Sequence, residues 1–291
     1  MEYRSAHFSV ATDLSASMAA SLVEDLEQMR AYLVVALFGA PREIPGRIRV
    51  VAFRDPDQVV ALTGQKSVAG VYTRDRLGEP LVVVRGDGLQ TSRSTVAHEL
   101  AHHFSWYAFP RQPLWFSEGL AMFVQTIASE GLELKGAMGL APREYLDWAK
   151  RVSPVPAAEL LAWKGRLADD EPGRHHVYGW LLVHYLVNSR PKEFLAFQRR
   201  LGAGEDPAAA WRAAFPEWDP ARPESLSALD DAIQGHRRAG TWRALKLRAE
   251  ADAHFERAPL APAEIHAQRL LIRHAFRRGG ADGAARAEAE E

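Results

Sequence analysis

Two histidines and a glutamate are the residues of this chain best placed to do chemistry together. They form the segment His98-Glu99-Leu100-Ala101-His102. On a helix, residues four apart lie one turn above each other on one face, so both imidazoles can reach one metal ion at about 2.0–2.1 Å. Glu99 follows the first histidine directly, where its carboxylate can take a proton from a water on the ion. The spacing predicts a zinc site with His98 and His102 as ligands and Glu99 as the general base.

The third ligand must be His, Asp or Glu, because the chain has no cysteine. A catalytic zinc takes three protein ligands and keeps a fourth position for water. Glu118 is the candidate, since a short loop would bring its expected helix, 113–129, back beside the helix expected at 92–107. The alternative is that Glu118 is an acid favoured by the positive end of its helix dipole. We predict Glu118 as the third ligand.

The block around Glu118, Trp115-Phe116-Ser117-Glu118-Gly119-Leu120-Ala121, together with the two histidines resembles the gluzincin metallopeptidases. It is similar to the zinc domain of the aminopeptidase N-like group and to the small bacterial peptidase MA-like proteins. In that group the Glu of this block is the third zinc ligand, so the resemblance implies zinc and peptide-bond hydrolysis. The Gly-x-Met-Glu-Asn block that binds the substrate amino terminus in aminopeptidases is missing, so aminopeptidase specificity is not implied. The zinc motifs span about residues 95–190.

A second match to this family begins at Val177-Tyr178-Gly179 and runs to Leu186. It resembles the helix that carries the transition-state tyrosine, and the matching position is Tyr178. The resemblance implies that the Tyr178 hydroxyl steadies the developing oxyanion. The alternative is a core tyrosine on an apolar helix.

Other histidines lie near these motifs. His175 and His176 are each a further candidate oxyanion donor, although side chains at a helix start are usually just solvated. His103 points off the zinc face by the helical angle and is expected to be structural or exposed. His184 is expected to have no role in the site.

The elements that must position these residues change character near residue 90. Before it, the pattern predicts strands at 7–11, 47–53, 68–73 and 81–85, with helices at 16–38 and 55–62. After it, helical periodicity predicts helices at 92–107, 113–129, 142–151, 156–163, 174–189, 191–201, 206–215, 224–238, 241–257 and 262–277. A terminal stretch from 280, rich in Ala and Glu, is expected to be frayed. Strands first and helices second favour an α+β class rather than alternating βαβ units. The five tryptophans spaced for packing are expected in the core: Trp106, Trp115, Trp148, Trp163 and Trp180.

The prolines between Pro216 and Pro223 mark the expected domain boundary. We predict a zincin-like metallopeptidase domain at 1–218, with a small mixed sheet and helices in 1–90 and a mainly helical subdomain in 91–218. The zinc site is expected in the cleft between these subdomains, where strand 81–85, if it forms an edge, can pair with an extended peptide. Residues 219–291 form a C-terminal helical extension that offers a surface for a protein partner.

Composition excludes several classes of protein. The net charge is −1, without the clustered basic residues of a nucleic-acid-binding surface. The longest apolar run, Tyr32 to Phe38, is far shorter than the roughly 20 residues that cross a bilayer, so no integral membrane segment is expected. The opening residues lack the apolar core of a signal peptide. We expect a cytoplasmic protein or, as the favoured alternative, an extracytoplasmic one whose leader was replaced by a start methionine.

The function predicted from these features is hydrolysis of a peptide or protein substrate by a zinc-bound water. The competing hypothesis is a binding or scaffold module that acts through its C-terminal helices. An intact Glu99 argues for the hydrolase, because a purely structural metal site needs no general base.

Overall fold

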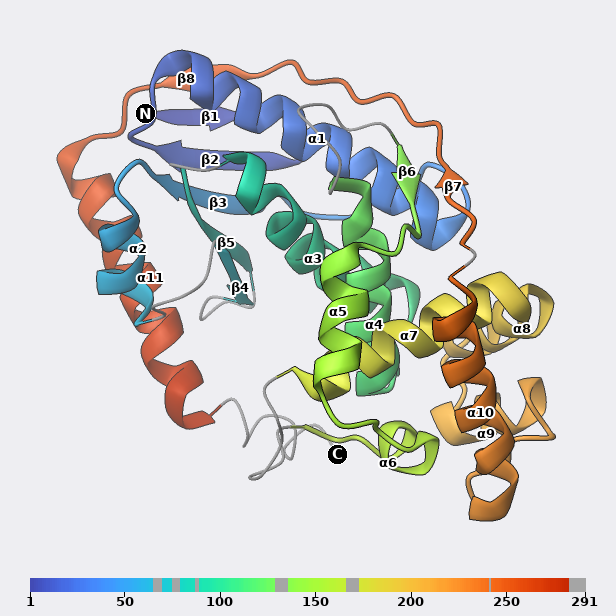
Figure 1. The fold of residues 1–291 in the computed structure, drawn as a ribbon. Helices are drawn as coiled ribbons and strands as arrows, with labels where there is room; N and C mark the ends of the chain where they lie inside the picture. The colour runs from blue at the N-terminus through green and yellow to red at the C-terminus, as the bar shows by residue number, and fades with distance from the viewer. Residues whose placement is uncertain are drawn as a thin grey trace. The chain divides into compact units, whose positions relative to one another are not determined.

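The computed structural model describes residues 1–64, 70–74, 79–86, 89–128, 136–165, 173–240 and 242–282 (Figure 1). The chain divides into two compact units. The first holds Met1–Leu100, Ile127–Gly136 and Leu247–Glu291, and the second holds Ala101–Thr126 and Ala137–Lys246. The division passes through helix α3 (Leu89–Ala108), so one continuous helix contributes to both units.

The first unit contains a six-stranded sheet in the order β4-β5-β3-β2-β1-β8. Its strands are β1 (Glu2–Arg4), β2 (Phe8–Thr12), β3 (Ile48–Phe53), β4 (Gly70–Arg74), β5 (Pro80–Arg85) and β8 (Glu256–Ala258). The β2–β3 and β3–β5 pairs are parallel and the others antiparallel. Both faces of β5 are covered, because Leu81 through Val84 are all fully buried. A mixed sheet and the α+β class are confirmed.

Two details of the expected sheet are wrong. The chain makes parallel crossovers, from β2 to β3 through α1 (Ala16–Phe38) and from β3 to β5 through α2 (Pro56–Thr63) and β4, so βαβ units are present. Strand 81–85 is not an edge, since β5 lies between β3 and β4. The short antiparallel β4 pairs along that side of β5, so the condition for peptide pairing there is not met.

Helix α1 supports the beginning of α3 within the first unit. It starts where the Ser15 hydroxyl accepts from the Met18 N–H, and it ends at Gly39 in the left-handed region. Asp25 on this helix binds Arg93 of α3, with 2.6 Å between Oδ2 and Nε. Both side chains are largely covered, so this charge-assisted bond fixes α3 against α1 five residues before His98.

The second unit is mainly helical. Its helices are α4 (Leu114–Val124), α5 (Arg143–Arg151), α6 (Ala157–Leu161), α7 (Arg174–Ser189), α8 (Pro191–Gly202), α9 (Pro207–Ala214) and α10 (Pro223–Ala239), and a 3-10 helix (Gln125–Ala128) follows α4. The short strands β6 (Ala137–Met138) and β7 (Leu245–Lys246) pair with each other. At the core, the Trp115 ring stacks on Phe197 at 5.8 Å and meets Trp211 edge-on at 5.5 Å. This aromatic cluster holds the first turn of α4 in place.

The helix predicted at 241–257 is wrong. Residues 242–258 hold β7 and β8 and no helix. Strands form here because β7 pairs with β6 and β8 pairs with β1. Leu245 stays exposed, so a helix at this position would have had little apolar burial to stabilise it. Helix α11 (Pro262–Asp282) follows and packs along α2, with Ile272 fully buried in the core of the first unit (Figure 1). The frayed tail expected from residue 280 falls mostly outside the described residues.

Two further expectations concern surfaces. Trp106 is 50% exposed, so its placement in the core is wrong, whereas Trp115, Trp163 and Trp180 are buried as predicted. A search of the described helices for a stretch of bilayer-spanning length and hydropathy found none.

Candidate metal centre

The three predicted ligands come together in the structure. One nitrogen each from His98 and His102 and one carboxylate oxygen of Glu118 all lie within 4.8 Å of one another. All three side chains are partly exposed. Within the described part of the chain, this is the group of metal-ligating side chains that could hold an ion. Because His98 and His102 are one turn apart on α3, the helix itself fixes the spacing of their imidazoles.

The geometry around His102 suits a shared ion. Its Nε2 lies 3.5 Å from Glu118 Oε2, and two donors about 2.0–2.1 Å from a tetrahedral ion lie about 3.4 Å apart. Its Nδ1 lies 3.2 Å from the Ser117 hydroxyl. A metal-bound Nε2 requires the ring proton on Nδ1, which then donates to Ser117 and fixes the tautomer. Sequence reasoning missed Ser117, although it directly precedes the predicted ligand.

Glu118 is positioned by a close crossing of α4 and α7. The next residue, Gly119, faces Gly179 so closely that a Cβ on Gly119 would lie 2.4 Å from the Gly179 carbonyl oxygen. A Cβ on Gly179 would in turn lie 2.9 Å from the Trp115 carbonyl oxygen. Only glycine at both positions allows this close approach of the two helices. The approach also sets which part of α7 faces Glu118.

Helix α7 brings His176, the lesser of the candidate donors, to Glu118. His176 Nε2 lies 3.6 Å from Glu118 Oε2, and the His176 side chain is 42% exposed. Tyr178 is 1% exposed, and Gln234 on α10 donates to its hydroxyl at 3.5 Å. The catalytic role of Tyr178 stays a prediction, and His176 is the side chain on this helix that contacts a candidate ligand.

Glu99 and His103 occupy opposite environments on α3. Glu99 directly follows His98 and is partly exposed. His103 is buried between the rings of Phe104 and Tyr107, both met edge-on. The structural role expected for His103 agrees with this packing.

His184 has more partners than expected from the sequence. It is fully buried, with Nε2 3.1 Å from the Gly139 carbonyl oxygen and Nδ1 3.0 Å from His236 Nε2. Asn188 also contacts Nδ1, at 3.2 Å. Burial, and then the neighbouring His236, lower the pKa of His184 to about 4. This neutral histidine holds α7 to α10 and to the Gly139 turn, so its role is structural.

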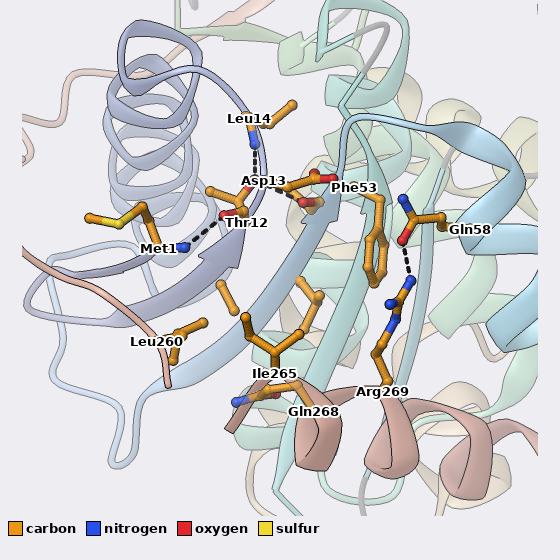
Figure 2. Close-up of a pocket in the computed structure, with 13 residues that line it drawn as sticks. Met1, Thr12, Asp13, Leu14, Phe53, Gln58, Leu260, Ile265, Gln268 and Arg269 are labelled. Atoms are coloured by element: carbon orange, nitrogen blue, oxygen red, sulfur yellow. Dashed lines mark hydrogen bonds between the residues drawn. The ribbon is translucent and has the colours of Figure 1, made fainter. Parts of the chain in front are cut away.

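A cavity of about 510 Å³ lies in the first unit, at the ends of β2 and β3 beside α11 (Figure 2). Phe53, Leu260 and Ile265 point into it, and Arg269 at its rim bonds to Gln58. None of the three candidate ligands lines this cavity. Its walls are mainly apolar and hold no group of metal-ligating side chains, so we do not take it as the reaction site.

Comparison with protein-family models gave no match to this chain, and no curated protein sequence matched it either. Two imidazoles and one carboxylate are a donor set that suits zinc, and three protein ligands leave one coordination position for water. The three side chains thus fit a metal ion that keeps one coordination position open.

Proposed function

We propose that this protein is a zinc-dependent peptide hydrolase of the gluzincin type, with His98, His102 and Glu118 as the zinc ligands. The observation that carries the proposal is the meeting of these three donors beside a partly exposed Glu99. Glu118 lies sixteen residues beyond His102 on another helix, so the pair on α3 alone does not bring it there. A zincin-like fold, with its substrate in an open cleft, is part of the same proposal.

The chemistry follows from the residues around the site. Held by His98, His102 and Glu118, a zinc ion would lower the pKa of a bound water and polarise a substrate carbonyl. Glu99 accepts the proton of the attacking water and passes it to the leaving nitrogen. His102 is kept in the correct tautomer by Ser117, at 3.2 Å from its Nδ1.

His176 is our candidate for the donor that stabilises the developing oxyanion. Its imidazole lies beside Glu118 and is partly open to solvent, so a substrate oxygen next to the ligand can reach it. Tyr178 remains the alternative that the family resemblance favours. For Tyr178 to donate to substrate, its hydroxyl must turn away from Gln234 and out of the core.

Metal content and hydrolysis of an unstructured protein such as casein test the proposal together. We expect about one zinc per chain, lost on chelation and strongly reduced in Glu118→Ala. Glu99→Gln should keep the metal and lower the rate by at least about 10²-fold, because only the proton acceptor is removed. Glu144→Gln, an exposed carboxylate on α5, is the matched control and should change neither.

Two outcomes would reject the proposal. Full zinc occupancy in Glu118→Ala would remove this residue from the ligands. Zinc binding without hydrolysis of any unstructured substrate would instead support a scaffold module that uses the metal for stability.

A further inference from the structure

Trp163, which follows α6, lies against the side chain that faces Glu118. Its indole is 8% exposed and meets the His176 ring edge-on, with 5.2 Å between centroids and 71° between planes. Its Nε1–H donates to the Gly165 carbonyl oxygen at 2.5 Å. Because this bond fixes the plane of the indole, the ring presents one defined face or edge to each neighbour.

The other neighbour of the indole is the preceding histidine. His175 lies 5.0 Å from Trp163 at 30°, is fully buried, and has its Nε2 3.0 Å from Glu159 Oε1. Arg174 holds the same carboxylate, at 3.1 Å from its Nη1. Trp163 is therefore packed between two successive histidines, and the first of them lies against the Glu159 carboxylate of α6.

Packing against Trp163 limits the orientations open to the His176 ring. A side chain that is 42% exposed at the start of a helix can occupy more than one rotamer, and its imidazole can also rotate about χ2. The rotamer in the structure places Nε2 3.6 Å from Glu118 Oε2, with Trp163 against the ring. Removing the indole would open space beside the ring and allow other rotamers.

We propose that Trp163 is a positioning residue that holds the His176 imidazole in the orientation facing Glu118, and that through it Trp163 supports the reaction. The inference rests on the proposed function for its catalytic consequence, but not for the orientation itself. The ring contacts of Trp163 described above are with His175 and His176 on α7, so we expect Trp163 to affect turnover more than metal binding.

A double-mutant cycle tests the proposal. We expect Trp163→Leu to lower kcat about 10-fold with little change in KM. This loss is smaller than the roughly 10²–10³-fold loss on removing an oxyanion donor, because the His176 imidazole would still be present. In a His176→Gln background the same substitution should cause no further loss, because the group being positioned is gone. Trp163→Phe, which keeps an aromatic edge, should recover most of the rate. An equal loss in both backgrounds would overturn the proposal.

A second measurement does not depend on activity. In metal-free protein with labelled histidine rings, we expect the His176 ring resonances to broaden or shift toward averaged values in Trp163→Leu and to recover in Trp163→Phe. The comparison with Trp163→Phe is needed, because loss of the indole ring current alone would shift the His176 signal in Trp163→Leu. Recovery of the line width in Trp163→Phe would show that the order of the His176 ring is restored. His176 line widths and shifts that both stay as in the wild type in Trp163→Leu would overturn the proposal even if no substrate is ever cleaved.

Trp218→Leu is the matched control. Trp218 is 5% exposed, also in the second unit, and its ring contacts are with Tyr185 and Phe215. We expect it to lower the thermal midpoint at least as much as Trp163→Leu while leaving zinc affinity, kcat and the His176 resonances as in the wild type. The same kinetic loss in this control would show that Trp163 acts only through stability.

Discussion

The crossing of α4 and α7 at Gly119 allows a quantitative prediction. In Gly119→Ala the new Cβ would lie 2.4 Å from the Gly179 carbonyl oxygen, 2.5 Å from its carbonyl carbon and 2.9 Å from Val183 Cγ2. Non-bonded atoms pack best at about 3.5–4.0 Å, so the helices must separate by about 1 Å. The closest atoms belong to the backbone and cannot rotate away.

The expected energy is a difference of two terms. Inserting a methyl group into a tightly packed core costs about 1–3 kcal/mol, and here the contact with backbone argues for the upper end. Replacing glycine by alanine within a helix returns about 1 kcal/mol. We expect Gly119→Ala to lower the free energy of unfolding by about 2 kcal/mol. Because the separation moves Glu118, zinc affinity should also fall, by about 10-fold or more.

Gly235→Ala on α10 is the control. A Cβ on Gly235 would meet nothing within 4 Å, and the residue lies inside a helix. The helix-propensity term then acts alone and should stabilise the protein by up to about 1 kcal/mol, with zinc affinity unchanged. Urea unfolding followed by tryptophan fluorescence, with zinc titration of each variant, makes the comparison. If Gly119→Ala proves as stable as Gly235→Ala, the helices do not cross as closely as described, and our account of how Glu118 is placed fails.

Three further predictions can be checked on the same protein. The pKa of His184 is lowered from its ordinary 6.5 to about 4, so the unfolded chain binds this proton at higher pH than the folded chain. The free energy of unfolding should therefore fall by up to about 3 kcal/mol as the pH drops from about 6.5 to about 4. The urea midpoints of His184→Gln should lack this pH dependence. Ser117→Ala should weaken zinc binding by about 10-fold without loss of stability, because the His102 Nδ1 loses its acceptor; unchanged affinity would mean that Ser117 does not set the tautomer. His176→Gln should lower kcat by about 10²-fold with KM nearly constant, whereas Tyr178→Phe should lower stability slightly and leave kcat near the wild-type value; the reverse pattern would return the donor role to Tyr178.

Residues close in sequence could be paired correctly without a structure. His98 and His102 meet because a helix repeats every 3.6 residues, and hydrogen bonding within α3 is enough to fix that spacing. The same periodicity predicted most helices after residue 90. It failed at 241–257, where Leu245 and Glu256 pair with strands distant in the sequence. The local helical preference of this segment was too weak to form a helix without an apolar face to bury.

Tertiary structure decided which residues join the pair on α3. His176 and Tyr178 are two positions apart on α7, so they point to different sides of the helix, and the sequence leaves open which side faces Glu118. The contact between Gly119 and Gly179 settles it, because it fixes the rotation of α7 against α4 and turns His176 toward the ligand while Tyr178 enters the core. Local spacing follows from the geometry of one helix, whereas the choice of face follows from the packing of two.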